Sequence, residues 1–269
     1  MAVYDDDLRL AHVLADAADD VTTRRFRALD LRVDTKPDLT PVTDADRMAE
    51  DVIRGILKRA RPRDGVLGEE GGKTGVGPRC WVVDPIDGTK NYVRGVPVWA
   101  TLLALMEGDE VVVGVVSAPA LSRRWWAAKG GGTWTGRSLA KASRCHVSGI
   151  QSLEDASLSY SDLEEWEKTG RLGAFLDLTR SVWRSRAYGD FWSHVLVAEG
   201  SADIAAEPEL SLWDLAALTI LVTEAGGRYT DLNGLPIIDG EGLVCTNGKL
   251  HDEVVRRLGG GQLTLHRSS

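Results

Sequence analysis

The residues with the clearest chemical potential follow an apolar run, Trp81–Val83, which ends in the sequence D-P-I-D-G-T at 84–89. Because Asp84 and Asp87 lie on either side of a proline turn, both carboxylates and the Ile86 carbonyl can converge on hard cations, which prefer oxygen ligands. Two bare aspartates so close together would repel each other. The structural alternative is that Asp84 ends a strand and Asp87 caps a helix.

Three further acidic segments occur in similar settings. Gly68-Glu69-Glu70 follows an apolar pair, while Asp44 and Asp214 each stand where a helix is expected to begin. Taken singly, these acids could be solvated loop residues or helix N-caps. Taken together with the pair at 84 and 87, they predict a cation site built from carboxylates.

The overall charge bears on the partner. The chain has 32 Lys+Arg against 40 Asp+Glu, a net charge of −8, which argues against nucleic acid as the main ligand. An acidic protein that binds an anionic substrate must neutralise charge locally, and divalent cations and helix N-termini are the available means.

The surrounding pattern predicts two halves. Apolar residues at helical spacing predict two helices on either side of a Pro-containing loop at 36–41, and short β-rich runs between 80 and 135 predict an antiparallel sheet. Beyond about Ser143, strands alternate with helices, which predicts an α/β arrangement. We therefore predict an N-terminal half, 1–142, with most of the candidate metal ligands. A C-terminal half, 143–258, would hold Asp214 and the specificity residues, and 259–269 would form a flexible tail.

Targeting signals are not evident. No stretch approaches the roughly 20 apolar residues that cross a bilayer, and the acidic segment Met1–Asp7 is unlike a signal peptide. We expect a cytoplasmic protein with no membrane partner. Cys80, Cys145 and Cys245 form no C-x-x-C motif and predict buried, inert thiols.

The four acidic segments together resemble the inositol monophosphatase superfamily of metal-dependent, lithium-sensitive phosphatases. The resemblance covers nearly the whole chain, in the family's order and approximate spacing, through V-T-D at Val42–Asp44, G-E-E at Gly68–Glu70, D-P-I-D-G-T at Asp84–Thr89 and W-D-L-A-A at Trp213–Ala217. It implies an α/β (α+β) fold, a five-layer α-β-α-β-α sandwich with the site between its halves, and a homodimer that hydrolyses a small phosphate monoester.

The resemblance also implies a role for each acid. Glu69, Asp84 and the Ile86 carbonyl would hold a first Mg²⁺, and Asp84, Asp87 and Asp214 a second, with a third, weaker ion near Glu69. Asp44 would support this network from behind Thr89, which would orient the attacking water. Paired cations lower the pKa of water and offset charge on the phosphoryl group, so no covalent intermediate is required.

Substrate contacts are expected on both halves. Backbone N–H groups of Gly88 and Thr89 would cradle a phosphate oxygen if a helix starts there. In inositol phosphatases an acid at the place of Glu207 binds ring hydroxyls, whereas the position of Asp190 is usually small or hydroxylated. A carboxylate at Asp190 suits a cationic leaving group, since it can pair with an ammonium or an imidazole N–H, and Lys90 departs from the inositol phosphatase pattern in the same direction. An N-cap role is the structural alternative for Asp190.

These features, with the segments 94–99 and 123–126, most resemble the actinobacterial histidinol-phosphate phosphatase branch, which implies L-histidinol phosphate as the substrate. The main alternative is an inositol-1-phosphate or broad small-molecule phosphatase. A bisphosphatase would need a second basic pocket, and Arg184 and Arg186 could serve that purpose, a structural role or a dimer contact. A regulatory binding protein on the same scaffold is a further alternative. The complete carboxylate set argues against it, because four such groups converging without metal would destabilise the fold.

Overall fold

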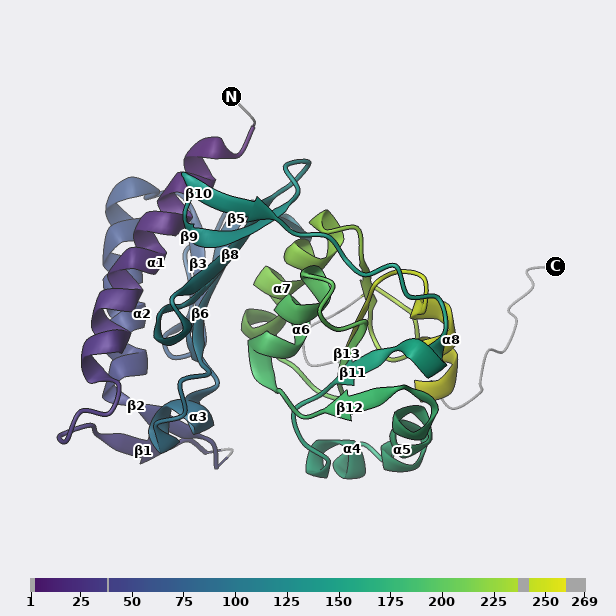
Figure 1. Ribbon diagram of the computed structural model, residues 1–269. Coiled ribbons are helices and arrows are strands. Elements are labelled where there is room, and N and C mark those ends of the chain that lie inside the picture. Colours follow the sequence, from purple (N-terminus) through teal and green to yellow (C-terminus); the bar gives the residue numbers. More distant parts are fainter. Residues whose placement is uncertain (1–2, 38, 237–241, 260–269) are drawn as a thin grey trace.

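The computed structural model describes residues 3–37, 39–236 and 242–259, so the predicted tail lies outside the described residues except for Gly259. The described residues stack in five layers, helix, sheet, helix, sheet and helix, as the resemblance implied (Figure 1). The site lies where the third layer meets the first sheet. The layers therefore decide which acids face one another.

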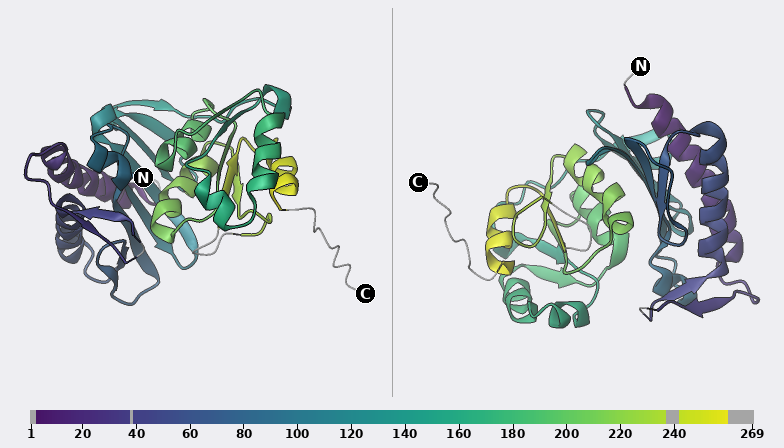
Figure 2. Two further views of the ribbon diagram at one scale, coloured as in Figure 1. Left: turned by 90° about the horizontal axis from the view of Figure 1, so that it is seen from below. Right: turned by 180° about the vertical axis from the view of Figure 1, so that it is seen from behind.

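The outer layer consists of α1 (Asp5–Arg25) and α2 (Asp44–Ala60), which cover one face of the larger sheet (Figure 2). Their apolar faces pack on the sheet in one cluster, in which Leu14 of α1, Ile53 of α2 and Trp81 of the sheet are fully buried. Thr43 caps α2 in a capping box, in which the Asp46 carboxylate accepts a hydrogen bond from the Thr43 N–H. This capping fixes where α2 begins.

The larger sheet has eight strands within the described residues, in the order β10-β9-β8-β7-β6-β5-β3-β4. All neighbouring strands pair antiparallel except β3 and β5, which are parallel. The predicted antiparallel sheet is thus confirmed with one parallel pair. The strands are β3 (Gly65–Gly68), β4 (Gly72–Thr74), β5 (Arg79–Asp87), β6 (Ala100–Glu107), β7 (Glu110–Ala118), β8 (Arg123–Ala128), β9 (Thr133–Ser138) and β10 (Lys141–Arg144).

The middle layer consists of α6 (Asp190–Ala198) and α7 (Leu212–Glu224), between the two sheets. α7 is apolar on nearly all sides, as expected for a helix with a sheet on each face. Gly114 of β7 permits the close approach of α7, because a Cβ there would lie 2.5 Å from Ile220 Cγ2. This packing fixes the position of Asp214, near the start of α7, relative to the larger sheet.

The second sheet has the order β12-β11-β13-β15-β14 in the described part of the chain. It packs on one side against α6 and α7 and on the other against α4 (Glu164–Lys168), α5 (Leu172–Ser181) and α8 (His251–Leu258). Its strands are β11 (Ser157–Ser159), β12 (Arg184–Arg186), β13 (Ile204–Glu207), β14 (Arg228–Thr230) and β15 (Leu243–Thr246).

Three smaller features complete the frame. The predicted loop at 36–41 lies between β1 (Val33–Thr35) and β2 (Pro41–Thr43), except that its last residue already belongs to β2. The short helix α3 (Thr89–Arg94) follows β5. β10 continues to Arg144, two residues past the predicted end of the N-terminal half, and the division into halves stays a prediction. Among the described residues, no helix combines the length and the apolar character needed to cross a membrane.

Candidate active site

The site begins where β5 leaves the core. Pairing between β5 and β6 shifts register between Asp84 and Asp87, so the strand bends at the proline. The Asp84 carboxylate accepts a hydrogen bond from the Ile86 N–H at 2.9 Å. The Asp84 carboxylate is therefore held in place by the backbone of the turn.

The opposite wall comes from α6 and α7. Asp214 is the third residue of α7, where its carboxylate accepts a hydrogen bond from the Ser211 N–H at 2.9 Å. Asp214 is thus not the N-cap that the structural alternative would make it. The Phe191 N–H on α6 donates to Asp87 Oδ2 at 2.7 Å. α6 thus directly contacts a predicted metal ligand on β5.

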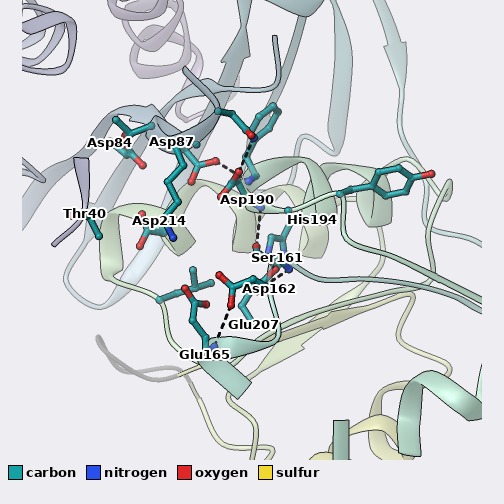
Figure 3. Close-up of a pocket in the computed structure, with 18 of the residues that line it drawn as sticks. Thr40, Asp84, Asp87, Ser161, Asp162, Glu165, Asp190, His194, Glu207 and Asp214 are labelled. Atoms are coloured by element: carbon teal, nitrogen blue, oxygen red, sulfur yellow. Dashed lines mark hydrogen bonds between the residues drawn. The ribbon is translucent and has the colours of Figure 1, made fainter. Parts of the chain in front are cut away.

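Asp84, Asp87 and Asp214 form one carboxylate cluster, in which a ligand oxygen from each lies within 4.8 Å of the others (Figure 3). Burial raises the pKa of Asp84 well above its usual range, and the nearby charges of Glu69, Asp87 and Asp214 add to that rise. Burial and the neighbouring carboxylates act in the same direction on Asp87 and raise the pKa of Asp214 to about 7. Three acids that oppose one another's ionisation need a positive partner.

The donor set fits divalent cations. In the described part of the chain, no Lys, Arg or His side chain forms an ion pair with any of the three clustered acids. All the donors are carboxylate oxygens, the ligands that magnesium and calcium prefer. Asp84, Asp87 and Asp214 are therefore the residues that would hold such an ion.

Glu69 lies beside this cluster without joining it. Its carboxylate pairs with Lys36 Nζ at 2.5 Å, and Lys36 also pairs with Glu70 at 2.6 Å. Its charge nonetheless contributes to the raised pKa of Asp84, after burial. Lys36 is thus the positively charged partner of both Glu69 and Glu70.

The prediction that Asp44 lies behind Thr89 was wrong. Asp44 turns away and forms an ion pair with Arg25 at 2.7 Å, whereas Asp46 Oδ1 lies 3.4 Å from Thr89 Oγ1. The physical reason is helix phase: Thr43 is the N-cap, so Asp44 is the first residue of α2 and Asp46 the third. Burial raises the pKa of Asp46 to about 6.

Thr89 and the Ile86 carbonyl contact each other. The Thr89 hydroxyl donates a hydrogen bond to Ile86 O at 2.8 Å. The predicted water-orienting group and the predicted carbonyl ligand thus stand side by side at the start of α3. Gly88, the residue before Thr89, is the N-cap of α3, so a helix does begin at this point.

A cavity of about 440 Å³ extends from the carboxylate cluster towards the second sheet (Figure 3). Asp190 and Glu207 line it together with Lys90. Asp190 is the first residue of α6, not its N-cap, and Asp190 Oδ2 accepts a hydrogen bond from Asn91 Nδ2 at 3.2 Å. Burial raises the pKa of Asp190 to about 6, although Lys90 acts against that rise.

Glu207 closes the far end of the cavity. It is 2% exposed, and its carboxylate accepts hydrogen bonds from Ser161 Oγ at 2.8 Å and Ser161 N at 3.2 Å. Asp162 and Glu165 also line this end. Arg184 and Arg186 are not among the described residues that line the cavity; Arg184 contacts Ser157 and Tyr188 instead.

Sequence reasoning missed several of these residues. Asp46 could have been found from the T-x-x-D spacing of a capping box at Thr43–Asp46. Ser161, Asp162 and Glu165 have no such signal, because a short loop and helix carry them to the cavity. The backbone N–H of Phe191 cannot be recognised from residue type at all.

Comparison with known proteins agrees with this geometry. The profile described as "Inositol monophosphatase family" matches residues 5–260. The chain belongs to the inositol monophosphatase family. This is a family of metal-dependent phosphomonoester hydrolases, and the chain is accordingly a phosphomonoesterase.

Individual relatives within the inositol monophosphatase family are similar over almost their full length. The chain is 64% identical to the histidinol-phosphatase of Streptomyces coelicolor over 95% of this chain and 97% of that protein. It is 60% identical to the histidinol-phosphatase of Mycobacterium tuberculosis over 95% and 99%. Among solved structures, the extragenic suppressor protein suhB of Bartonella henselae matches with a TM-score of 0.87 at 29% identity, covering 95% of this chain and 99% of that one.

Proposed function

We propose that this protein hydrolyses L-histidinol phosphate to L-histidinol and phosphate in the cytoplasm, with Mg²⁺ as its cofactor. The observation that carries the proposal is the charge of the cavity. Beyond the carboxylate cluster, its walls carry Asp162, Glu165, Asp190, Glu207 and Glu209. Lys90 is the only Lys or Arg among the described lining residues.

Such a cavity favours a leaving group with positive charge. L-Histidinol carries an ammonium group and an imidazole, and both can donate hydrogen bonds to carboxylates. Inositol offers hydroxyl groups without charge, and a bisphosphate would bring a second anion against the same acids. The names of the two histidinol-phosphatases to which the chain is 64% and 60% identical support the same substrate.

The reaction transfers the phosphoryl group to water. The water oxygen bonds to phosphorus, the ester P–O bond breaks, and the leaving alcohol takes up a proton. Divalent cations held by Glu69, Asp84, Asp87 and Asp214 would supply a Lewis acid that activates water and offsets negative charge on the phosphoryl group.

The chain's own residues provide position. The Thr89 hydroxyl, with Asp46 beside it, would orient the attacking water. The Thr89 hydroxyl donates towards Asp46, so Asp46 can accept the proton that the water gives up. The N–H groups of Gly88 and Thr89 at the start of α3 would bind a phosphate oxygen. Asp190 and Glu207 would hold the leaving alcohol so that its ester bond faces the carboxylate cluster. We also propose that the protein is a homodimer.

The test compares kcat/KM for L-histidinol phosphate, myo-inositol 1-phosphate and fructose 1,6-bisphosphate in the presence of Mg²⁺, for the wild type and Asp190→Asn. We expect the wild type to prefer L-histidinol phosphate. Losing one charge-assisted hydrogen bond should lower kcat/KM for that substrate roughly 10- to 100-fold in the variant. Its kcat/KM for inositol phosphate should stay nearly constant.

Equal rates on all three substrates would leave a broad phosphatase and refute the charge argument. An absence of metal-dependent turnover on every substrate would favour the regulatory protein instead.

A further inference from the structure

The loop that carries Glu69 is held from behind by a second acid, Glu50, on α2. Glu50 is 2% exposed. Its carboxylate accepts hydrogen bonds from the Glu70 N–H and the Gly71 N–H, both at 2.8 Å. Hydrogen bonds to an ionised acceptor are stronger than neutral ones, so this carboxylate ties the backbone next to Glu69 to the helix.

Shape complements these bonds. A Cβ at Gly68 would lie 2.3 Å from Glu50 Oε1, which is closer than any real contact. The Glu50 carboxylate therefore fills the space beside Gly68 on one side of Glu69 and binds the N–H groups on the other side. A single buried side chain thus contacts the backbone on both sides of Glu69.

The charge of Glu50 is balanced locally. Arg54 Nε donates to Glu50 Oε1 at 2.6 Å, one helical turn along α2, and Arg54 also donates to the Gly72 carbonyl. Glu50 thus has a protein cation as its partner and does not need a metal ion. Its carboxylate faces the loop backbone, not the carboxylate cluster.

The position of Glu69 is otherwise weakly determined. Its N–H donates to the Val83 carbonyl at 3.1 Å, next to Asp84, which fixes one point of the backbone. Its carboxylate pairs with Lys36, a long and flexible side chain from the β1–β2 loop. The bonds from Glu50 to the two following residues supply the second fixed point.

We propose that Glu50 is a positioning residue for the metal site: it holds the 68–71 loop so that the Glu69 carboxylate is presented to a divalent cation beside Asp84. This inference rests on the proposed role of Glu69 as a metal ligand. Glu50 acts through the backbone, without contacting metal or substrate.

The test measures metal binding without substrate. MgCl₂ is titrated into the full-length protein by calorimetry, with the wild type, Glu50→Gln and the control Asp51→Asn. Asp51 is the next residue on the same helix and is exposed, so its variant loses the same charge without touching the loop. The Gln amide keeps the shape but retains only one acceptor oxygen.

Groups that orient metal ligands typically contribute 10- to 100-fold in affinity, and we expect a loss of about that size for Glu50→Gln and none for Asp51→Asn. The Mg²⁺ concentration needed for half-maximal activity should rise by the same factor. The kcat at saturating Mg²⁺ should largely recover, which a general loss of folding would not allow.

A Glu50→Gln protein that melts at a lower temperature but binds Mg²⁺ like the wild type would overturn the proposal and leave a structural role. Should that variant fail to fold, Gly68→Ala decides, because its methyl group displaces the Glu50 carboxylate without removing its charge. Weaker Mg²⁺ binding supports the proposal, and unchanged binding refutes it. Unchanged binding in Glu69→Gln would overturn the proposal together with the ligand role of Glu69. The substrate preference is measured separately and would still stand.

Discussion

The carboxylate cluster makes a prediction in which stability and activity change in opposite directions. Asp214→Asn removes one of three mutually opposed acids and keeps an oxygen that can accept the Ser211 N–H bond. Without metal, the variant should therefore be more stable than the wild type at pH 8, where Asp214 is ionised. With Mg²⁺, it should have lost most of its activity.

The magnitude follows from the pKa of Asp214, which the fold raises from 3.8 to about 7. That difference corresponds to roughly 4 kcal/mol of unfavourable free energy once the group is ionised. Asp214 is partly exposed, so solvent screens some of this cost, and we expect a net gain of about 1–3 kcal/mol. For a chain of this size each kcal/mol raises the melting temperature by about 2–4 °C.

The assay is a thermal melt in EDTA at pH 8, paired with Mg²⁺-dependent phosphate release. Asp155→Asn, at an exposed position, is the matched control and should change neither quantity. A lower melting temperature for Asp214→Asn in EDTA would refute the claim that the acids oppose one another. Undiminished activity would show that Asp214 is not a ligand.

Two further predictions concern the neighbouring acids. Asp46→Asn should lower kcat about 100-fold, the usual scale for losing a proton acceptor. Asp44→Asn should cost about 1 kcal/mol of stability, because it loses the ion pair with Arg25, and should leave kcat near the wild-type value. A larger effect on kcat for Asp44→Asn than for Asp46→Asn would show that Asp44 is the acid that acts with Thr89. In EDTA, the contribution of Asp190 and Asp214 to stability should be most favourable below about pH 4. Stability should then fall as pH rises through their folded pKa values, about 6 for Asp190 and about 7 for Asp214. The reason is that the folded state binds more protons than the unfolded state over this range. Saturating Mg²⁺ should reduce this fall. A metal-free melting temperature that rises between about pH 5 and about pH 8 would contradict the raised pKa values of Asp190 and Asp214.

Much of the fold was predictable because long elements carry a clear hydrophobic period. The strands β5 to β8 and the helices α1, α2 and α7 follow such patterns. β4 could not be predicted, since its three residues are all exposed and show no alternation. The strands β12 and β14 are equally brief, and β10 is only one residue longer.

The candidate site was predictable only where spacing decides geometry. Asp84 and Asp87 share one turn, so their convergence follows from local structure. The choice between Asp44 and Asp46 depends on which residue caps α2, and the capping pattern was overlooked. The pairing of Glu69 with Lys36 spans 33 residues and depends on the folded position of the β1–β2 loop.

The contact between Phe191 and Asp87 limits how this enzyme could evolve towards another substrate. Asp190 has a backbone φ of 49°, a region that favours Gly, Asn and Asp, and of these only Asp carries charge. Position 191 tolerates any side chain that fits the core, but proline would remove the N–H that holds Asp87. Only a few residue types at position 190 could therefore change the leaving-group preference. A substitution that shifts the backbone at this turn would also move the Phe191 N–H and so change the metal site.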